Sequence, residues 1–254
     1  MTAEAFTTPT GVLVSAITTA QMREIDRVAV HEVGPNLYQM MENAGRNLAE
    51  LCVESLGDGW DARPVVVAAG TGGNGGGGMC AARHLVNHGG DVVVVVTEPT
   101  RLTGVPATQL DLFRAAGGRI VDVDNIGSLQ PDMVVDAVLG YSLSGAPRGA
   151  AATLIDWMIG GPASVISLDV PSGIDSTSGR APGVFVSASK TMTLALPKSG
   201  LDGAEVGQLY LADIGIPREV YRRVGVHVPT NLFTGSYRVG LTPVDTGHDR
   251  HPAP

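Results

Sequence analysis

The chain has 254 residues, a formal net charge of −8 at pH 7 and 44% hydrophobic residues, which is enough for one α/β domain with a full core. Its lysines and arginines form no cluster, so the sequence lacks the charge pattern of a protein that binds nucleic acid or an anionic membrane surface. The longest apolar runs have the length of a strand, well short of the roughly 20 residues that a membrane span needs.

The two ends of the chain show little periodicity. Residues 1–15 and 238–254 are rich in Pro, Thr and Gly, and we predict that they are tails around a single α/β domain at 16–237. The start lacks the basic and apolar segments of a signal peptide, and the cysteines are Cys52 and Cys80 alone. These features predict a cytoplasmic protein with reduced thiols.

Two helices are expected at the start of the domain. Thr18 and Gln21 have the spacing of a capping box, and an apolar stripe at helical spacing follows, made of Met22, Ile25, Ala29 and Val33. Gly34 and Pro35 are expected to end this helix. A second helix is predicted over "LYQMMENAGRNLAELCVESL".

Strand and helix patterns then alternate from residue 64 onward. The strand patterns are "PVVVAA", "DVVVVVTEP", "RIVDV", "DMVVDAVLG" and "ASVISLDVPSG", followed by "SKTMTLALPK" and "GQLYLADIG". The first helix pattern between them is "GGMCAARHLVNHG". Valine-rich runs without polar alternation are typical of strands buried on both faces. The sequence therefore predicts a doubly wound, mostly parallel, Rossmann-like α/β sheet.

The segment "GTGGNGGGG" at 70–78 follows the first of these strands and holds seven glycines. Gly70, Gly72 and Gly75 match the G-x-G-x-x-G loop of dinucleotide-binding proteins, and Glu98 lies near the expected place of a ribose-binding acid. This fingerprint is weak evidence for a dehydrogenase, and it leaves the later loops unexplained. The glycine density indicates close approach of a ligand to the backbone, or turns with positive φ.

Two later loops each begin with an aspartate at the end of a strand. They are "VVDAVLGYSLSGAPRG" and "ISLDVPSGIDSTSG". Because the carboxyl ends of parallel strands share one edge of the sheet, we expect Asn74, Asp136 and Asp169 to converge there. Either acid alone could instead cap its loop or accept N–H bonds in a turn. The three loops together favour a binding or catalytic site.

These loops, together with "MENAGR" and "TMTLALPKSGL", resemble in order and spacing those of the NAD(P)H-hydrate epimerase family, also called the YjeF N-terminal domain. The resemblance runs from about residue 15 to 217. It implies an isomerase that interconverts the two epimers of hydrated NADH or NADPH, so that a separate dehydratase can act on one of them. It further implies a homodimer, a nucleotide-like small-molecule substrate and a potassium ion as cofactor.

The resemblance also implies roles for individual residues. Potassium would be held by Asn74, Asp136 and Ser172, and such oxygen ligands suit a hard cation. Asp169 would carry the proton, with a second acid and a cation near it. The implied substrate contacts are Asp169 and two loop segments, Gly73, Asn74, Gly75, Gly76 and Gly77, and Gly140, Tyr141, Ser142, Leu143, Ser144 and Gly145. Lys198, in "LPKSG", is interpreted as a solvated loop lysine in preference to a phosphate ligand.

The glycine segment departs from the family pattern G-P-G-N-N-G-G-D-G. Thr71, Gly73 and Gly77 stand where the family has proline, the first asparagine and aspartate. An amide and a carboxylate are therefore missing, which enlarges the expected pocket. Three hypotheses remain: a hydrate epimerase, an isomerase, dehydratase or cyclase of the same fold with another small-molecule substrate, and a binding module without catalysis. The presence of Asn74, Asp136, Asp169 and Ser172 argues against the binding module, because a scaffold does not need an assembled ion and acid cluster.

Overall fold

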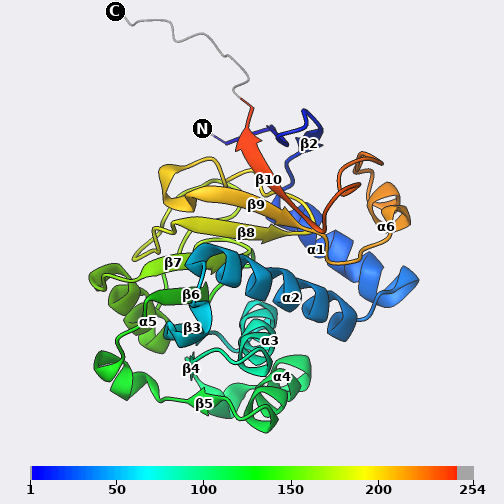
Figure 1. The fold of residues 1–254 in the computed structure, drawn as a ribbon. Helices are drawn as coiled ribbons and strands as arrows, with labels where there is room; N and C mark the ends of the chain where they lie inside the picture. The colour runs from blue at the N-terminus through cyan, green and yellow to red at the C-terminus, as the bar shows by residue number, and fades with distance from the viewer. Residues whose placement is uncertain (1, 245–254) are drawn as a thin grey trace, which may run out of the picture.

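The structure is a computed structural model that describes residues 2–244. Its strands are β1 (Ala5–Thr7), β2 (Leu13–Ser15), β3 (Val65–Ala69), β4 (Val92–Val96), β5 (Arg119–Ile120), β6 (Met133–Ala137), β7 (Ser164–Leu168), β8 (Lys190–Leu194), β9 (Gln208–Ala212) and β10 (Arg238–Pro243). They form one sheet in the order β2-β1-β10-β9-β8-β7-β6-β3-β4-β5 (Figure 1). The seven neighbouring strands β9, β8, β7, β6, β3, β4 and β5 are parallel to one another. The strands β10, β1 and β2 extend the sheet beyond β9, and each is antiparallel to its neighbour.

Helices cover both faces of this sheet (Figure 1). They are α1 (Thr19–Val28), α2 (Leu37–Leu56), α3 (Gly73–Asn87), α4 (Gly104–Ala115), α5 (Gly149–Gly160) and α6 (Arg218–Arg223), with short helical turns η1 (Ala29–Val33), η2 (Trp60–Ala62), η3 (Pro99–Arg101), η4 (Val123–Ser128) and η5 (Ala204–Val206). Of the helices at residues 2–244, none is long and apolar enough to cross a bilayer.

Alternate residues of the central strands pack on opposite sides of the sheet. Val65 and Val67 of β3 pack with α2, α3 and α4, whereas Val66 and Ala68 pack with α5 and η4. Each strand is therefore buried on both faces, which explains its unbroken apolar sequence. The predicted doubly wound, mostly parallel α/β fold is confirmed.

The predicted first helix begins and ends where its capping signals place it. The Thr18 side chain accepts from the Gln21 N–H, and the Gln21 side chain accepts from the Thr18 N–H, which closes the capping box. After Val28 the chain continues as the π-helical turn η1 to Val33, and Gly34 follows with φ 77°. This helix packs with α6 against the β9 and β10 side of the sheet, in a third apolar cluster.

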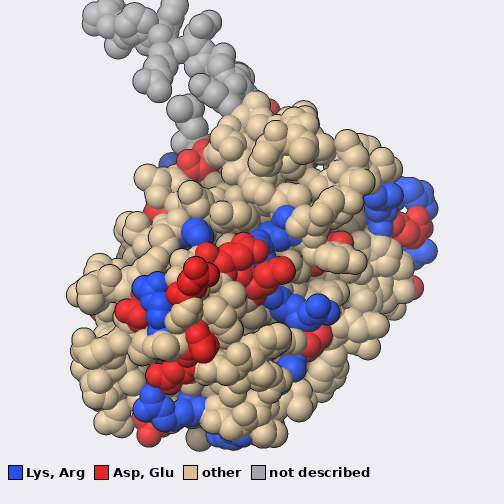
Figure 2. Space-filling view, in the orientation of Figure 1, with Lys and Arg blue, Asp and Glu red and all other residues tan. Residues whose placement is uncertain are grey.

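Charged side chains of both signs share the face seen in Figure 2. Acidic side chains gather over α2, which carries Glu42, Glu50 and Glu54. Lysines and arginines lie around and between them. This face therefore presents mixed charge, with no continuous basic surface on the part of the chain that is described.

The strand order reverses next to β3, which lies between β4 and β6. At this point the Gly70 N–H donates to the Ala137 carbonyl at 3.0 Å. A Cβ atom on Gly70 would lie 2.0 Å from the carbonyl oxygen of Val138, so only glycine fits between the ends of β3 and β6. In open α/β sheets ligands bind at such a reversal, outside the carboxyl ends of the strands.

The structure differs from the prediction that residues 1–15 and 238–254 are tails. The short strands β1 and β2 pair with each other, and β1 also pairs with β10. Phe6 and Val14 are fully buried. Three-residue strands carry no measurable periodicity, so the sequence pattern could not reveal β1 and β2. The strand β10, which joins β1 to the rest of the sheet, lies more than 200 residues away from β1 in the chain. Residues 245–254 of the predicted tail lie outside the described residues.

Two further element boundaries differ from the sequence prediction. The glycine segment at 70–78 is expected as a loop, but α3 begins at Gly73, so most of these glycines form its first turns. The strand expected at "RIVDV" is reduced to Arg119–Ile120, and Val123 begins η4. β5 is an edge strand that pairs with β4 alone, so it has fewer partners to extend its ladder.

Candidate active site

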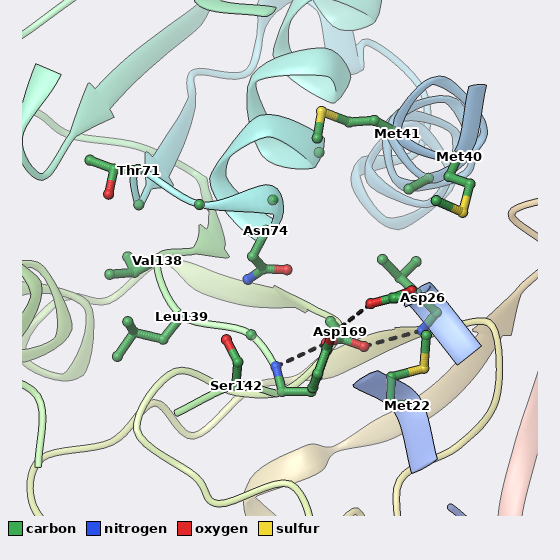
Figure 3. Close-up of a pocket in the computed structure, with 18 of the residues that line it drawn as sticks. Met22, Asp26, Met40, Met41, Thr71, Asn74, Val138, Leu139, Ser142 and Asp169 are labelled. Carbon is green, nitrogen blue, oxygen red and sulfur yellow. Dashed lines mark hydrogen bonds between the residues drawn. The ribbon is translucent and has the colours of Figure 1, made fainter. Parts of the chain in front are cut away.

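A cavity of about 430 Å³ opens at the carboxyl ends of β3, β6 and β7. The methionines Met22, Met40 and Met41, from α1 and α2, line it together with polar residues of the strand-end loops. Figure 3 shows the Asn74 side chain extending from the first turn of α3 toward Asp169, with Asp26 close to Asp169. The cavity thus lies where the strand order reverses.

Asp169 follows β7 directly and has a left-handed backbone, with φ 68°. Its N–H donates to the Met192 carbonyl at 2.7 Å, and its Oδ2 accepts from the Tyr141 N–H at 3.0 Å. Ala195, after the adjacent strand β8, has a similar backbone with φ 65°. Non-glycine residues adopt this conformation rarely, and it is found preferentially at functional sites. The turn holds the Asp169 carboxylate at the cavity wall.

Lys198 is fully buried, which corrects its interpretation as a solvated loop lysine. Its Nζ donates to Asp169 Oδ1, to the Leu194 carbonyl at 2.8 Å and to Thr193 Oγ1 at 3.2 Å. It also lies 5.9 Å from the centre of the Tyr141 ring. Lysines are seldom buried unless they are paired, and the partner that makes this burial possible comes from a different loop. Sequence spacing cannot show that pairing.

Asp26 lies on α1 and lines the same cavity, although no sequence motif singles it out. Its Oδ2 accepts a hydrogen bond from the Tyr141 hydroxyl at 2.6 Å. Burial raises the pKa of the Asp26 carboxyl, against the opposing effect of that hydrogen bond. One signal was available: Asp26 follows Met22 by four residues, and residues at this spacing share a helix face.

Asp136 is fully buried at the end of β6. Its carboxylate accepts from Ser167 Oγ at 2.8 Å, from the Ser172 N–H at 2.8 Å and from Ser172 Oγ. Burial raises the pKa of Asp136, and these hydrogen bonds oppose the effect. No lysine or arginine within residues 2–244 forms an ion pair with it. Its hydrogen-bond partners come from β7, which holds Ser167, and from the loop after β7, which holds Ser172.

Asn74 has an amide whose oxygen and nitrogen are both buried and have no hydrogen-bond partner among the described residues. A Cβ atom on Gly140 would lie 3.2 Å from Asn74 Cγ and 3.3 Å from Asp169 Oδ2. Asn74 and Asp169 therefore approach each other across Gly140. A buried amide without partners costs free energy, so these atoms are suited to hold a ligand or an ion.

Most glycines of the 70–78 segment serve close packing, whereas a Cβ atom on Gly72 or Gly73 would meet no atom within 4 Å, and none of the seven has positive φ. A Cβ atom on Gly75 would lie 1.9 Å from the Gly70 carbonyl oxygen. A Cβ atom on Gly76 would lie 2.6 Å from Met41 Sδ, and one on Gly78 would lie 2.5 Å from Ala137 Cβ. Of the implied substrate contacts, Gly75 and Gly76 do not line the cavity, because they pack against protein atoms.

Other implied substrate contacts divide between two cavities. Gly73, Asn74, Gly77, Gly140, Tyr141, Ser142 and Asp169 line the cavity described above. Leu143, Ser144 and Gly145 line a neighbouring cavity of about 250 Å³. Both cavities include Gly140, Ser142 and Arg148, so they adjoin each other along the loop after β6.

A separate side-chain cluster joins α2 to α3. Glu42, Cys80 and His84 offer three ligand atoms within 4.8 Å of one another. Nη2 of Arg83 lies 2.6 Å from Glu42 Oε2 and 3.4 Å from both Cys80 Sγ and His84 Nε2. Burial raises the pKa of the Cys80 thiol to about 12. Because a guanidinium already occupies the centre, we interpret the cluster as an ion-pair network between the two helices.

Fold and site together define a class: a doubly wound α/β protein whose ligand cavity lies at the strand reversal and carries buried carboxylates. A family model described as YjeF-related protein N-terminus matches residues 37–200. The chain belongs to this family.

Named relatives span most of the chain. It is 52% identical to an NAD(P)H-hydrate epimerase of Dehalogenimonas lykanthroporepellens, over 93% of this chain and 97% of the relative. It is 32% identical to the bifunctional NAD(P)H-hydrate repair enzyme Nnr of Escherichia coli, over 77% of this chain and 38% of that protein. A crystal structure of a yeast protein has the same fold, with a TM-score of 0.76 and 21% identity over 89% of this chain and all of that one.

Proposed function

We propose that this chain is an NAD(P)H-hydrate epimerase, an isomerase that interconverts the two epimers of hydrated NADH or NADPH. The relative from Dehalogenimonas lykanthroporepellens carries this name and aligns with nearly its whole length. The structural observation that carries the proposal is the Asp169 carboxylate, which faces the cavity with its position fixed by Lys198 and by the Tyr141 N–H. A carboxylate held in this way can exchange a proton with a bound substrate.

Acid–base chemistry suffices for this epimerisation. The hydrated ring carries a hydroxyl on a carbon next to the ring nitrogen. Protonation of the hydroxyl allows the nitrogen lone pair to expel water, and water can return to either face of the ring. Asp169 is the carboxylate that we assign to this proton exchange, and Asp136 is assigned a structural and ion-binding role because its carboxylate is fully buried.

We further propose a potassium site formed by Asn74, Asp136 and Ser172. The donor set fits a hard cation, because it consists of oxygen atoms. Two features of the structure support the fit: the Asn74 amide oxygen has no other partner among the described residues, and the buried Asp136 has no cationic partner there. A bound potassium ion would offset the Asp136 charge and orient the Asn74 amide at the cavity wall.

We propose a homodimer from the family resemblance. The exposed residues Leu37 and Tyr38, at the start of α2, offer apolar surface for it. Light scattering at micromolar concentration should give twice the chain mass, and a monomer mass over that whole range would exclude the dimer.

A second candidate function is supported by the cavity wall. Gly73 and Gly77 line the cavity without side chains where the family has an amide and a carboxylate. The chain could therefore act as an isomerase, dehydratase or cyclase on another small molecule. The two candidates differ in whether hydrated NADH or NADPH is turned over.

The test is an NMR assay in which one purified epimer of hydrated NADH is mixed with the protein. We expect both epimers to appear at their equilibrium ratio. Asp169→Asn should lower turnover by a factor on the order of 10² to 10⁴ and largely retain binding, because it keeps the shape and removes the carboxylate that exchanges the proton. Asp156→Asn, at an exposed acid on α5, is the matched control and should keep full activity. Absence of turnover by the wild type would favour the second candidate.

A further inference from the structure

We infer that Asp26 is a second catalytic acid of this cavity and that it delivers the proton to the hydroxyl of the bound substrate. The inference rests on the proposed epimerase function and assigns the acid step within it. Nothing in the family resemblance stated above selects this residue.

Tyr141 connects Asp26 to Asp169. Its hydroxyl donates to Asp26 Oδ2 at 2.6 Å, and its backbone N–H donates to Asp169 Oδ2 at 3.0 Å. Its own carbonyl accepts from Ser176 Oγ at 3.0 Å, which fixes the residue from a third side. Both carboxyl groups line the same cavity, and they lie close together in Figure 3. One rigid residue therefore sets the position of both acids.

The surroundings of the two carboxyl groups differ in charge. Asp169 is in contact with the buried ammonium of Lys198, whereas Asp26 forms no ion pair within residues 2–244. Asp26 is surrounded by Tyr141, by the more distant charges of Lys198 and Asp169, and by Tyr221 of α6. Burial raises the pKa of Asp26. Two carboxyl groups whose surroundings differ in this way commonly divide the acid and base roles of a reaction.

The protons and electrons of the reaction balance when the roles are divided. Asp26 gives its proton to the hydroxyl oxygen as the carbon–oxygen bond breaks, the nitrogen lone pair forms a C=N⁺ bond, and one water leaves. Water then adds to the opposite face, the nitrogen recovers its lone pair, and Asp169 accepts the proton of the added water. Exchange with solvent water returns that proton to Asp26, and the cycle is complete.

The test compares Asp26→Asn with Glu24→Gln in the NMR epimer assay. Both changes replace a carboxyl with its amide on α1, but Glu24 is exposed and pairs with Arg27. We expect kcat to fall by a factor on the order of 10² to 10⁴ in Asp26→Asn with KM changed by no more than a few-fold. Glu24→Gln should keep the wild-type kcat. An Asp26→Asn variant with at least a third of the wild-type kcat would overturn the inference.

The pH profile supplies a second measurement that a purely structural role would not affect. An acid must be protonated to act, so the wild-type kcat should fall as pH rises through the pKa of Asp26. Tyr141→Phe removes the hydrogen bond that favours the ionised form, so the midpoint should move to higher pH. Should Asp26→Asn fail to fold, an unchanged midpoint in Tyr141→Phe would overturn the inference.

The same measurements distinguish failure of the epimerase function from failure of the catalytic role of Asp26. A wild-type protein that interconverts the epimers, together with an equally active Asp26→Asn, contradicts the role of Asp26 and leaves the epimerase function standing. A wild type without turnover contradicts the epimerase function, and the role of Asp26 falls with it.

Discussion

At the scale of single residues, we expect the contact between Lys198 and Asp169 to contribute strongly to stability. Lys198→Met leaves a buried carboxylate without its partner, which typically lowers the free energy of unfolding by about 3–5 kcal/mol. The double variant with Asp169→Asn should recover much of this loss, because neither charge then remains buried. Urea unfolding of the single and double variants measures both values. A cost below about 1 kcal/mol for Lys198→Met would contradict this account of the pair.

Gly77 is limited by packing, and its backbone is helical without positive φ. A Cβ atom there would lie 2.9 Å from Leu168 Cδ2, and such overpacking costs about 1–3 kcal/mol. The gain in helix propensity from glycine to alanine, up to about 1 kcal/mol, offsets part of it. Gly77→Ala should therefore lower Tm, and Leu168→Val in the same chain should restore part of the loss.

Gly73→Ala is the matched control for Gly77→Ala, because no atom lies within 4 Å of a Cβ at that position. Its Tm should stay unchanged or rise. The same crowding at Gly77 bears on substrate binding, since an aspartate in its place could reach the cavity only after Leu168 moves. Equal effects of alanine at the two glycines would argue against the packing explanation.

At the scale of elements, the short strand β1 lies near one edge of the sheet and contributes one buried side chain, Phe6, to the core. Phe6 is fully buried in the cluster that also contains α1 and α6. Phe6→Ala should lower the free energy of unfolding by about 3–5 kcal/mol. Leu13→Ala, in the neighbouring strand β2, changes a side chain that is 58% exposed and should stay within about 0.5 kcal/mol. If urea unfolding gives the two variants the same free energy of unfolding, β1 does not contribute to stability through Phe6.

At the scale of the whole molecule, potassium should stabilise the folded chain if the proposed site binds it. An ion at 100 times its Kd stabilises the native state by about 2.7 kcal/mol through mass action. Tm should therefore be higher in potassium chloride than in tetramethylammonium chloride of equal concentration. Asn74→Ala removes an amide with no other partner among the described residues, so it should abolish this difference. Equal melting curves of the wild type in the two salts would count against the site.

Elements with strong local signals were predictable from the sequence. Valine-rich runs identified the central parallel strands β3, β4 and β6, and the Thr18 capping box with the apolar stripe after it identified α1. The loops after β3, β6 and β7 pointed to Asn74, Asp136 and Asp169, because parallel strands bring their carboxyl ends to one edge. These signals arise from residues close together in the chain, such as the spacing of a capping box or the periodicity of apolar side chains. They can therefore be read directly from the sequence.

The remaining features depend on contacts between distant parts of the chain. Lys198 is buried because Asp169 of another loop compensates its charge, and Asp26 reaches the cavity because α1 packs beside the loop of Tyr141. The pairing of β1 with β10 joins the two ends of the domain. The sequence by itself therefore determined the sheet, the leading helices and the loops that form the cavity. Only the tertiary structure decided which charges are buried together and where the sheet ends. Both features depend on the free energy of contacts between residues that lie far apart in the chain.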